Sequence, residues 1–291
     1  MTVQKQAACP VCGLRTAHKS FDDGFFYCRD CELHFTQNVP VAADYDAAYY
    51  ERGGGMLQKI ASVFWESALT KIAGRLRRAT STGPKTRMKV LDVGCGAGQL
   101  AGGLSRRGFA SAGIDTSKAA IAAAKKKFPG VNFKVGRLGG AVFPPASFDA
   151  VTLFHVLEHV PKPLPFLRAI RQVLKPKGIF LLRVPNIASF EARLAGKKWF
   201  HFDYPWHVVH YSPKALTEVL RRAGFSSVSM NHNPGEYKQS LLYAVFAFLG
   251  MKNIPVALRV ASLPLQIFFA PLSWILGLAG SGATIEAQAR K

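Results

Sequence analysis

Four of the five cysteines form two pairs near the N-terminus, with the spacing of a metal-binding site. The pairs are Cys9-Pro-Val-Cys12 and Cys28-Arg-Asp-Cys31, and 15 residues separate them. Each Cys-x-x-Cys turn supplies two thiolates to a tetrahedral ion, and four thiolates close its coordination sphere. We therefore predict a structural zinc site in a zinc ribbon spanning residues 1–40. Two disulfides are the alternative, which a reducing cytosol disfavours.

A glycine-rich motif, VLDVGCGAG, runs from Val90 to Gly98. Its glycines, Gly94, Gly96 and Gly98, let the backbone approach a ligand at a helix N-terminus. A dinucleotide fingerprint has its third glycine at the sixth position of the motif, which is Gln99 here. Asp115 follows about 20 residues later, where a carboxylate can hold ribose hydroxyls. The motif indicates a cofactor loop, and a purely structural turn is the alternative.

Two later segments carry histidines. In FHVLEHV, His155, Glu158 and His159 follow a strand end, where α/β sheets place ligands, and a histidine there can accept a proton from a hydroxyl. The alternative is that Glu158 and His159 only fix the loop. The segment HFDYPWHVVHYS is interpreted as a substrate cover, with a metal pair at His207 and His210 or simple packing as alternatives. Its candidate substrate contacts are Trp206, His207, His210 and Tyr211.

Short strands and helices alternate from Met88 onward, which predicts a mainly parallel sheet covered on both faces. An amphipathic helix precedes them, with an apolar stripe at Leu57, Ile60, Phe64, Leu69, Ile72 and Leu76. The expected strands are 88–94, 109–115, 131–135, 148–154, 178–184, 225–231 and 283–291. The expected helices are 98–107, 117–127, 163–174 and 213–223, the last with Ser212 as N-cap and Pro213 at its first position.

The motifs VLDVGCGAG, GID, SFDAVTLFHVLEHV and LKPKGIFLLRVPN resemble class I S-adenosylmethionine-dependent methyltransferases, in particular the group of the ubiquinone-pathway O-methyltransferases. The resemblance covers Met88 to Met230 and the terminal strand. It implies a Rossmann-like doubly wound sheet in which Asp92 orders the glycine loop and the glycines approach the methionine part of the cofactor. It further implies that Asp115 binds the ribose, and that the backbone around Phe154 and His155 faces the sulfonium.

One position departs from the family pattern. Family members usually carry an acid after the third strand to bind the adenine amine, whereas this chain has Gly136-Arg137-Leu138. Arg137 cannot accept a hydrogen bond, so adenine recognition is expected to fall to the Leu138 backbone. Because of this departure, a second interpretation stays open, in which the chain is a relative of these enzymes that binds the cofactor without catalysing a reaction.

Charge and apolarity together suggest a membrane surface. The chain has 38 Lys and Arg against 17 Asp and Glu, a net charge of +21, and 49% apolar residues, which excludes intrinsic disorder. Residues 241–278 are almost entirely apolar but are interrupted by Pro255, Pro264 and Pro271. We expect two interfacial helices in a monotopic anchor at the inner face of a membrane. A soluble subdomain or a dimer interface is the alternative.

The expected organisation is a zinc ribbon at 1–40, a connector and amphipathic helix at 41–84, and a methyltransferase domain at 85–291 with a hydrophobic insertion at 241–278. The N-terminus shows no secretory signal, which favours the cytoplasm. The expected reaction is O-methylation of a lipid-linked, quinone-like or glycan-like acceptor. An RNA methyltransferase that uses the ribbon and the basic surface is the main rival, because a basic protein also suits nucleic acid. The oligomeric state stays open.

Overall fold

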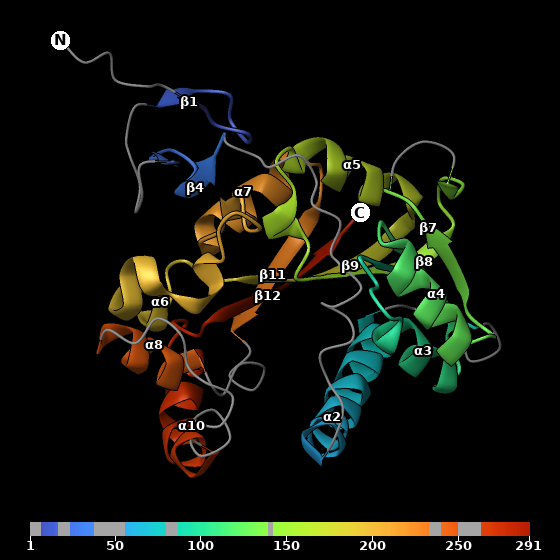
Figure 1. Cartoon of the computed structure of the whole chain (residues 1–291). Helices are drawn as coiled ribbons and strands as arrows, with labels where there is room; N and C mark the ends of the chain where they lie inside the picture. Colours follow the sequence, from blue (N-terminus) through green and yellow to red (C-terminus); the bar gives the residue numbers. More distant parts are fainter. Residues whose placement is uncertain are drawn as a thin grey trace.

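The computed structural model describes residues 7–16, 24–37, 56–79, 87–138, 142–232, 240–249 and 263–291. The connector at 41–55, the linker around Gly83 and Pro84, and Pro255 within the insertion lie outside these residues. Figure 1 shows a central sheet with helices on both sides and the N-terminal strands at one end.

The central sheet has seven strands in the order β11–β12–β9–β8–β5–β6–β7 (Figure 1). Neighbouring strands from β7 to β9 are parallel, whereas β12 is antiparallel to both β9 and β11. This arrangement confirms the predicted doubly wound sheet. The order reverses between β5 and β8, which is where open α/β sheets bind ligands. The strands are β5 Lys89–Val93, β6 Ala110–Asp115, β7 Asn132–Val135, β8 Phe148–Phe154, β9 Leu174–Pro185, β11 Ser226–His232 and β12 Thr284–Arg290.

Helices cover both faces of the sheet. On one face, Leu167 of α5 and Leu216 of α7 are buried with Val151 of β8 in the main apolar cluster. On the other, Leu69 of α2 and Leu104 of α3 belong to a second cluster. The helices are α2 Met56–Ala79, α3 Gln99–Arg106, α4 Lys118–Lys127, α5 Pro163–Val173, α6 Phe190–Ala195, α7 Pro213–Arg222, α8 Ser240–Phe248 and α10 Leu263–Leu278, with 3₁₀ turns η2 Leu157–His159, η3 Gly196–Lys198 and η4 Phe200–Phe202.

Local sequence signals account for the helix starts. The Ser212 hydroxyl accepts a hydrogen bond from the Ala215 backbone N–H at 3.1 Å, and Pro213 occupies the first turn, which confirms the predicted start of α7. The stripe predicted for α2 is confirmed where its side chains are described, because Leu69, Ile72 and Leu76 are buried.

The N-terminal segment forms two small sheets. Strands β1 Ala7–Ala8 and β2 Arg15–Thr16 pair with each other, and β3 Phe25–Cys28 pairs with β4 Leu33–Thr36. The other edge of β4 pairs with β10 Val209–His210, far along the chain. Leu33 and Phe35 are buried in the same apolar cluster as the main sheet. The N-terminal segment and the central sheet therefore share one core.

Two expectations about element bounds are wrong. The strand expected at 178–184 begins at Leu174, directly after α5, because this residue already pairs with Phe148 of β8. Pro271 was expected to interrupt the insertion, but it lies inside α10. Proline removes one intrahelical hydrogen bond, and the turns after it have their own, such as the one from Ala279 N to Ile275 O at 2.9 Å. Among the described residues, no helix is both long and apolar enough to span a bilayer.

Candidate active site

The glycine loop follows β5 and leads into α3, as expected from the sequence. Gly94, Gly96 and Gly98 have φ values of 71°, 50° and 75°, a region that L-residues with a side chain rarely adopt. A Cβ atom on Gly94 would also lie 2.3 Å from Cγ2 of Val156. The loop therefore requires glycine for its conformation and its packing, and it leaves a backbone that a ligand can approach.

Asp115 ends β6 beside this loop. Its Oδ2 accepts a hydrogen bond from the Gly96 N–H at 2.8 Å, and its Oδ1 accepts one from the Ser117 N–H at 2.9 Å. The half-buried carboxylate thus fixes the middle of the glycine loop, at the edge of the sheet where β5 and β6 end. Its contact with ribose stays a prediction, and its role in shaping the loop was not foreseen.

Asp92 lies under the loop and is buried. Its Oδ1 accepts a 2.8 Å hydrogen bond from Oγ1 of Thr152 on β8, a partner that the sequence did not reveal. Burial raises the pKa of Asp92 to about 7, although the Thr152 hydroxyl acts against this shift. Asp92 therefore connects the two strands at which the sheet order reverses, in agreement with a role in ordering the loop.

Replacing Asp92 by asparagine should remove a pH dependence of stability. The folded chain holds the Asp92 proton more tightly than the unfolded chain does, so the free energy of unfolding should fall as pH rises from about 4 to about 7. Three pKa units correspond to roughly 4 kcal/mol at most. The amide oxygen of the variant can still accept from Thr152, but an amide does not titrate. Urea unfolding of both proteins across this range measures the difference.

The matched comparison is Thr152→Val, which removes the hydroxyl that opposes the raised pKa of Asp92. Its free energy of unfolding should therefore fall with pH over a wider range than that of wild type. Parallel curves of stability against pH for wild type and Asp92→Asn would contradict the raised pKa.

His155, Glu158 and His159 lie at the carboxyl end of β8. His155 has a φ of 56°, a costly conformation for a non-glycine residue that is common at functional sites. Its Nδ1 lies 3.5 Å from Oε1 of Glu158, which is 1% exposed. Burial acts to raise the pKa of Glu158, but His155, His207 and His159 together lower it to about 2. The structure thus brings the three predicted catalytic residues together around an ionised carboxylate.

The segment from His201 to Tyr211 returns to this group. The ring centroids of His159 and His207 are 4.7 Å apart, and the Val208 N–H donates to the Glu158 carbonyl at 2.9 Å. Trp206 is half-buried beside them. His207 therefore lies next to Glu158 and His159. It does not form the metal pair with His210 that was the alternative interpretation.

Two other predicted substrate contacts lie deeper. His210 is 2% exposed and stacks on Phe202 with centroids 5.0 Å apart, and Tyr211 is fully buried. Burial lowers the pKa of His210 well below its usual range, so its ring is neutral. Packing, the alternative interpretation, accounts for both positions, and their contact with an acceptor stays a prediction.

The remaining predicted cofactor residues are Phe154, at the end of β8, and Leu138, shortly after β7. Phe154 is half-buried, and the Arg183 guanidinium lies 4.3 Å from its ring centroid. Leu138 is buried in the main apolar cluster, whereas Arg137 is exposed. The Arg137 side chain therefore points to solvent, and adenine binding by the Leu138 backbone stays a prediction.

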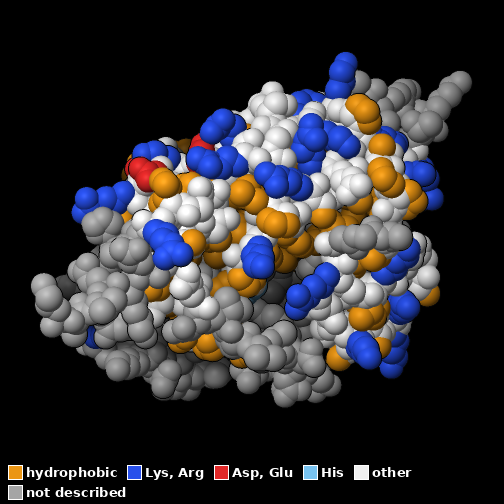
Figure 2. Space-filling model, turned by 90° about the horizontal axis from the view of Figure 1, so that it is seen from above, with side chains coloured by type: hydrophobic (Ala, Val, Ile, Leu, Met, Phe, Trp, Pro, Cys, Tyr) orange, Lys and Arg blue, Asp and Glu red, His pale blue; other side chains and the backbone are white. Residues whose placement is uncertain are grey.

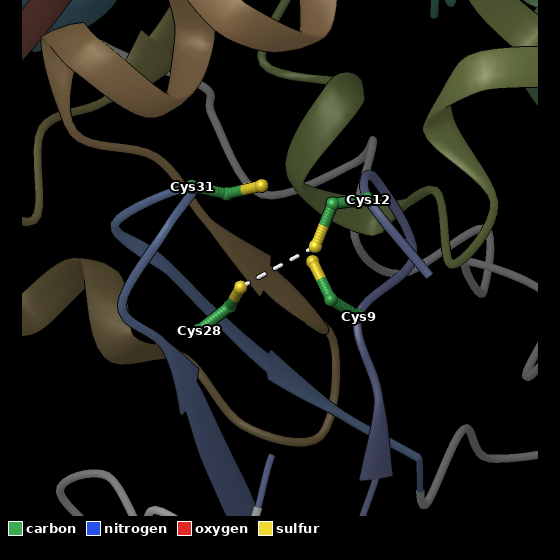
Figure 3. A group of neighbouring side chains, drawn as sticks. All are labelled: Cys9, Cys12, Cys28 and Cys31. Atoms are coloured by element: carbon green, nitrogen blue, oxygen red, sulfur yellow. Dashed lines mark hydrogen bonds between the residues drawn. The ribbon is translucent and has the colours of Figure 1, made fainter. Parts of the chain in front are cut away.

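The four N-terminal cysteines point toward a common centre (Figure 3). Their sulfur atoms all lie within 4.8 Å of one another, and those of Cys12 and Cys28 are 3.5 Å apart. All four thiols are free, so the disulfide alternative is not what the structure has. The arrangement suits a tetrahedral ion with four thiolate ligands. The fifth, Cys95, is buried among Ala101, Ile121 and Phe133, in agreement with a packing role.

The chain is similar in sequence to known proteins. The model of the family described as "Methyltransferase domain" matches residues 64–230. A ubiquinone biosynthesis O-methyltransferase of Azoarcus sp. is 34% identical over 50% of this chain and 69% of that protein. A probable S-adenosylmethionine-dependent methyltransferase of Mycolicibacterium smegmatis is 32% identical over 47% and 51%. A second ubiquinone biosynthesis O-methyltransferase, from Xanthomonas campestris, is matched over 61% of its length.

Solved structures show the same fold. The methyltransferase in a complex with the Haloferax volcanii Trm112 activator aligns with a TM-score of 0.57, at 19% identity, over 86% of this chain and 98% of that one. An Archaeoglobus fulgidus S-adenosylmethionine-dependent methyltransferase aligns with a TM-score of 0.50, at 22% identity, over 77% and 94%. At these identities the likeness concerns the fold alone.

Proposed function

Because the chain belongs to the methyltransferase-domain family and is a class I S-adenosylmethionine-dependent methyltransferase, we propose that it methylates an oxygen of a lipid-linked, quinone-like or glycan-like acceptor at a membrane surface. The oxygen and the quinone-like class rest on the relatives named ubiquinone biosynthesis O-methyltransferase. The single observation that supports the membrane surface is α10, whose outer side carries large exposed apolar side chains. They are Phe268, Leu272, Trp274, Ile275 and Leu278.

The residues at the sheet edge fit the cofactor. The glycine loop leaves no room for a Cβ atom at Gly94, and Asp115 is held beside it. When bound, S-adenosylmethionine supplies a methyl group already activated by its positive sulfur. Gly94, Gly96 and Gly98 would hold its methionine part and Asp115 its ribose, and the chain's main task is to position the acceptor oxygen in line with the methyl group.

His155 and His159 can accept the proton that the acceptor hydroxyl loses. His155 stands at the end of β8, about 25% exposed, with the Glu158 carboxylate 3.5 Å from its Nδ1. The buried carboxylate stabilises the protonated imidazole and orients the ring, as a positioned acid does for a general base. In this assignment Glu158 is a positioning residue.

The proposal includes a structural zinc ion on Cys9, Cys12, Cys28 and Cys31. The donor set is the one that closed zinc sites use, and Cys9 and Cys31 are buried. Burial raises the pKa of the Cys9 thiol to about 12, so a bound cation is needed to hold it as a thiolate. The ion would stabilise the N-terminal hairpin, which consists of β3 and β4, and it would take no part in the reaction.

Substitution of Asp115 tests the cofactor assignment. Asp115→Ala should weaken S-adenosylmethionine binding at least tenfold, because the variant loses both the ribose contact and the hydrogen bond to Gly96. Asp115→Asn keeps an oxygen for one backbone donor and should lose less. Isothermal titration calorimetry measures both. Equal affinity of wild type and Asp115→Ala would contradict the assignment.

The acceptor class can be tested on the purified protein itself. Extraction with organic solvent, followed by mass spectrometry, should release a lipid-linked or quinone-like molecule. An RNA acceptor would instead show as salt-dependent RNA binding, with affinity falling steeply as phosphate contacts are screened. On the face of the molecule that Figure 2 shows, the Lys and Arg side chains of the described residues are spread out rather than gathered in one tract.

A further inference from the structure

We propose that Arg183 is a positioning residue for methyl transfer, because it fixes the turn of residues 154–156 against which the reacting end of the cofactor is held. Arg183 lies on β9, and Glu286 on β12 fixes its side chain in turn. The proposal rests on the proposed placement of S-adenosylmethionine at the glycine loop. It is independent of the acceptor class and of the membrane surface.

The turn after β8 lies where the sulfur of the cofactor is expected. In the sheet, β5 lies between β6 and β8, and the glycine loop follows β5. With the ribose at Asp115, at the end of β6, the rest of the cofactor extends across the glycine loop toward the end of β8. The loop and the turn are in contact, since a Cβ atom on Gly94 would lie 2.3 Å from Cγ2 of Val156. The geometry of this turn therefore decides how the sulfur and its methyl group are held.

The turn needs support because His155 adopts an unfavourable conformation. Its φ of 56° lies in the left-handed region, and a non-glycine residue persists there only where its surroundings hold it. The His155 N–H donates to the Arg183 carbonyl at 3.0 Å. Any residue at position 183 could make this backbone hydrogen bond, so the contribution of an arginine must come from its side chain.

The Arg183 side chain holds the ring of Phe154, the residue directly before His155. Phe154, Arg183 and Glu286 are register partners in one row across β8, β9 and β12. The guanidinium lies 4.3 Å from the ring centroid, and such a cation–π contact is stronger where the two groups are withdrawn from water. Arg183 is 5% exposed and Phe154 is half-buried. The contact therefore restricts the Phe154 ring and, with it, the backbone that enters the turn.

Glu286 fixes the guanidinium of Arg183. Its Oε2 lies 2.5 Å from Nε of Arg183, and its other carboxylate oxygen forms an ion pair with Arg75 of α2. A buried ion pair is a poor source of stability, because the cost of removing both charges from water offsets their attraction. What this pair adds is orientation, since a charge-assisted hydrogen bond from Nε fixes the direction of the guanidinium plane.

The double variant Arg183→Met, Glu286→Leu tests this role without leaving one buried charge alone. It removes one positive and one negative charge, and apolar residues of similar volume often replace a buried ion pair without loss of stability. Arg75 can then turn to solvent, because its side chain is already 23% exposed. Thermal unfolding should therefore give a melting temperature close to that of wild type. The conservative variant Arg183→Lys keeps a cation above the Phe154 ring and should retain part of the wild-type behaviour.

The readout is the affinity for S-adenosylmethionine relative to that for S-adenosylhomocysteine, which lacks the methyl group and the positive charge on sulfur. Isothermal titration calorimetry of the full-length chain measures both. The double variant should bind S-adenosylmethionine roughly five- to tenfold more weakly, which is the size of one desolvated cation–π contact. Its affinity for S-adenosylhomocysteine should change much less, because that ligand has no methyl group to be held. A general loss of structure would weaken both ligands alike, as should Asp115→Ala, which acts at the ribose.

The matched control is Lys175→Met, which removes an ion pair between β8 and β9 at the other end of these strands. Nζ of Lys175 lies 2.7 Å from Oδ1 of Asp149, and the variant should bind both ligands as wild type does. If the double variant loses affinity for both ligands equally, or for neither, Arg183 does not position the turn. A wild-type chain that binds neither ligand would instead overturn the placement of the cofactor, and this proposal with it.

Discussion

The substitution Cys28→Ser is expected to loosen the active-site segment, which runs from His201 to Tyr211. The substituted residue itself belongs to the N-terminal hairpin, which consists of β3 and β4. The loss of one thiolate should release the zinc ion and unfold β3 and β4, because a structural zinc site is coupled to local folding. Strand β4 pairs with β10, and Val208, next to β10, donates to the Glu158 carbonyl. Hydrogen exchange of amides 157–160 and 207–211 should accelerate at least tenfold.

Further contacts join the same parts. The Thr36 N–H donates to the Val208 carbonyl at 3.0 Å, and the Lys214 ammonium group is 2.7 Å from Glu32. The Lys214–Glu32 pair is exposed and contributes little on its own. Amides of β5 and β8 should keep their protection, because their neighbours do not belong to the hairpin.

The matched control is Cys95→Ser, which alters a cysteine that lies in the glycine loop and is buried against Phe133. It should keep zinc and the protection of 207–211. If Cys28→Ser loses its zinc while amides 207–211 exchange as in wild type, the hairpin does not support the active-site segment. Metal analysis of each variant makes that comparison unambiguous.

Much of the fold could be predicted because its signals are local. The glycine motif marks a strand, a tight turn and a helix within nine residues, and Ser212-Pro213 marks a helix start. Alternation of strands and helices then restricts the sheet to few arrangements. The start of β9 at Leu174 was missed, since a lysine-rich stretch with Pro176 and Gly178 gives no strand signal and pairing with β8 decides its structure.

The residues of the site could be predicted from the sequence, but the contacts between them could not. Asp115 and Asp92 were identified from position, yet the hydrogen bonds to Gly96 and Thr152 depend on how strands approach in space. His207 was expected either to cover the substrate or to pair with His210, three residues away. Its neighbours in the fold are Glu158 and His159, far along the chain, and no sequence spacing encodes that distance.

Placing glutamate on the outer side of α10 is expected to weaken membrane binding strongly. Phe268 and Ile275 are seven residues apart on α10, and their exposures are 76% and 55%. Moving each side chain into the acyl boundary of a bilayer contributes about 1.5–3 kcal/mol. The double variant Phe268→Glu, Ile275→Glu should therefore bind vesicles of phosphatidylglycerol and phosphatidylcholine at least tenfold more weakly than wild type. Co-sedimentation over a range of lipid concentrations measures this change.

A control variant distinguishes the loss of apolar side chains that insert into the bilayer from the effect of the added negative charge. Leu14→Glu with Val135→Glu changes two exposed apolar side chains by the same charge at positions far from α10 in the sequence. Against a net charge of +21, two added acids should weaken vesicle binding less than the α10 variant does, because attraction to anionic lipid falls off within a Debye length. Raising the salt concentration should weaken wild type and control alike, because screening acts on the basic surface and not on the apolar side chains.

Two results would contradict the membrane surface. One is a wild-type chain that ignores anionic vesicles at low salt, and the other is an α10 variant that binds as tightly as wild type. A wild-type dimer in solution that the α10 variant converts to a monomer would identify the covered face as a protein interface instead. In that event the exposed side chains of α10 would serve assembly, and a lipid-linked acceptor would lose the observation that supports it.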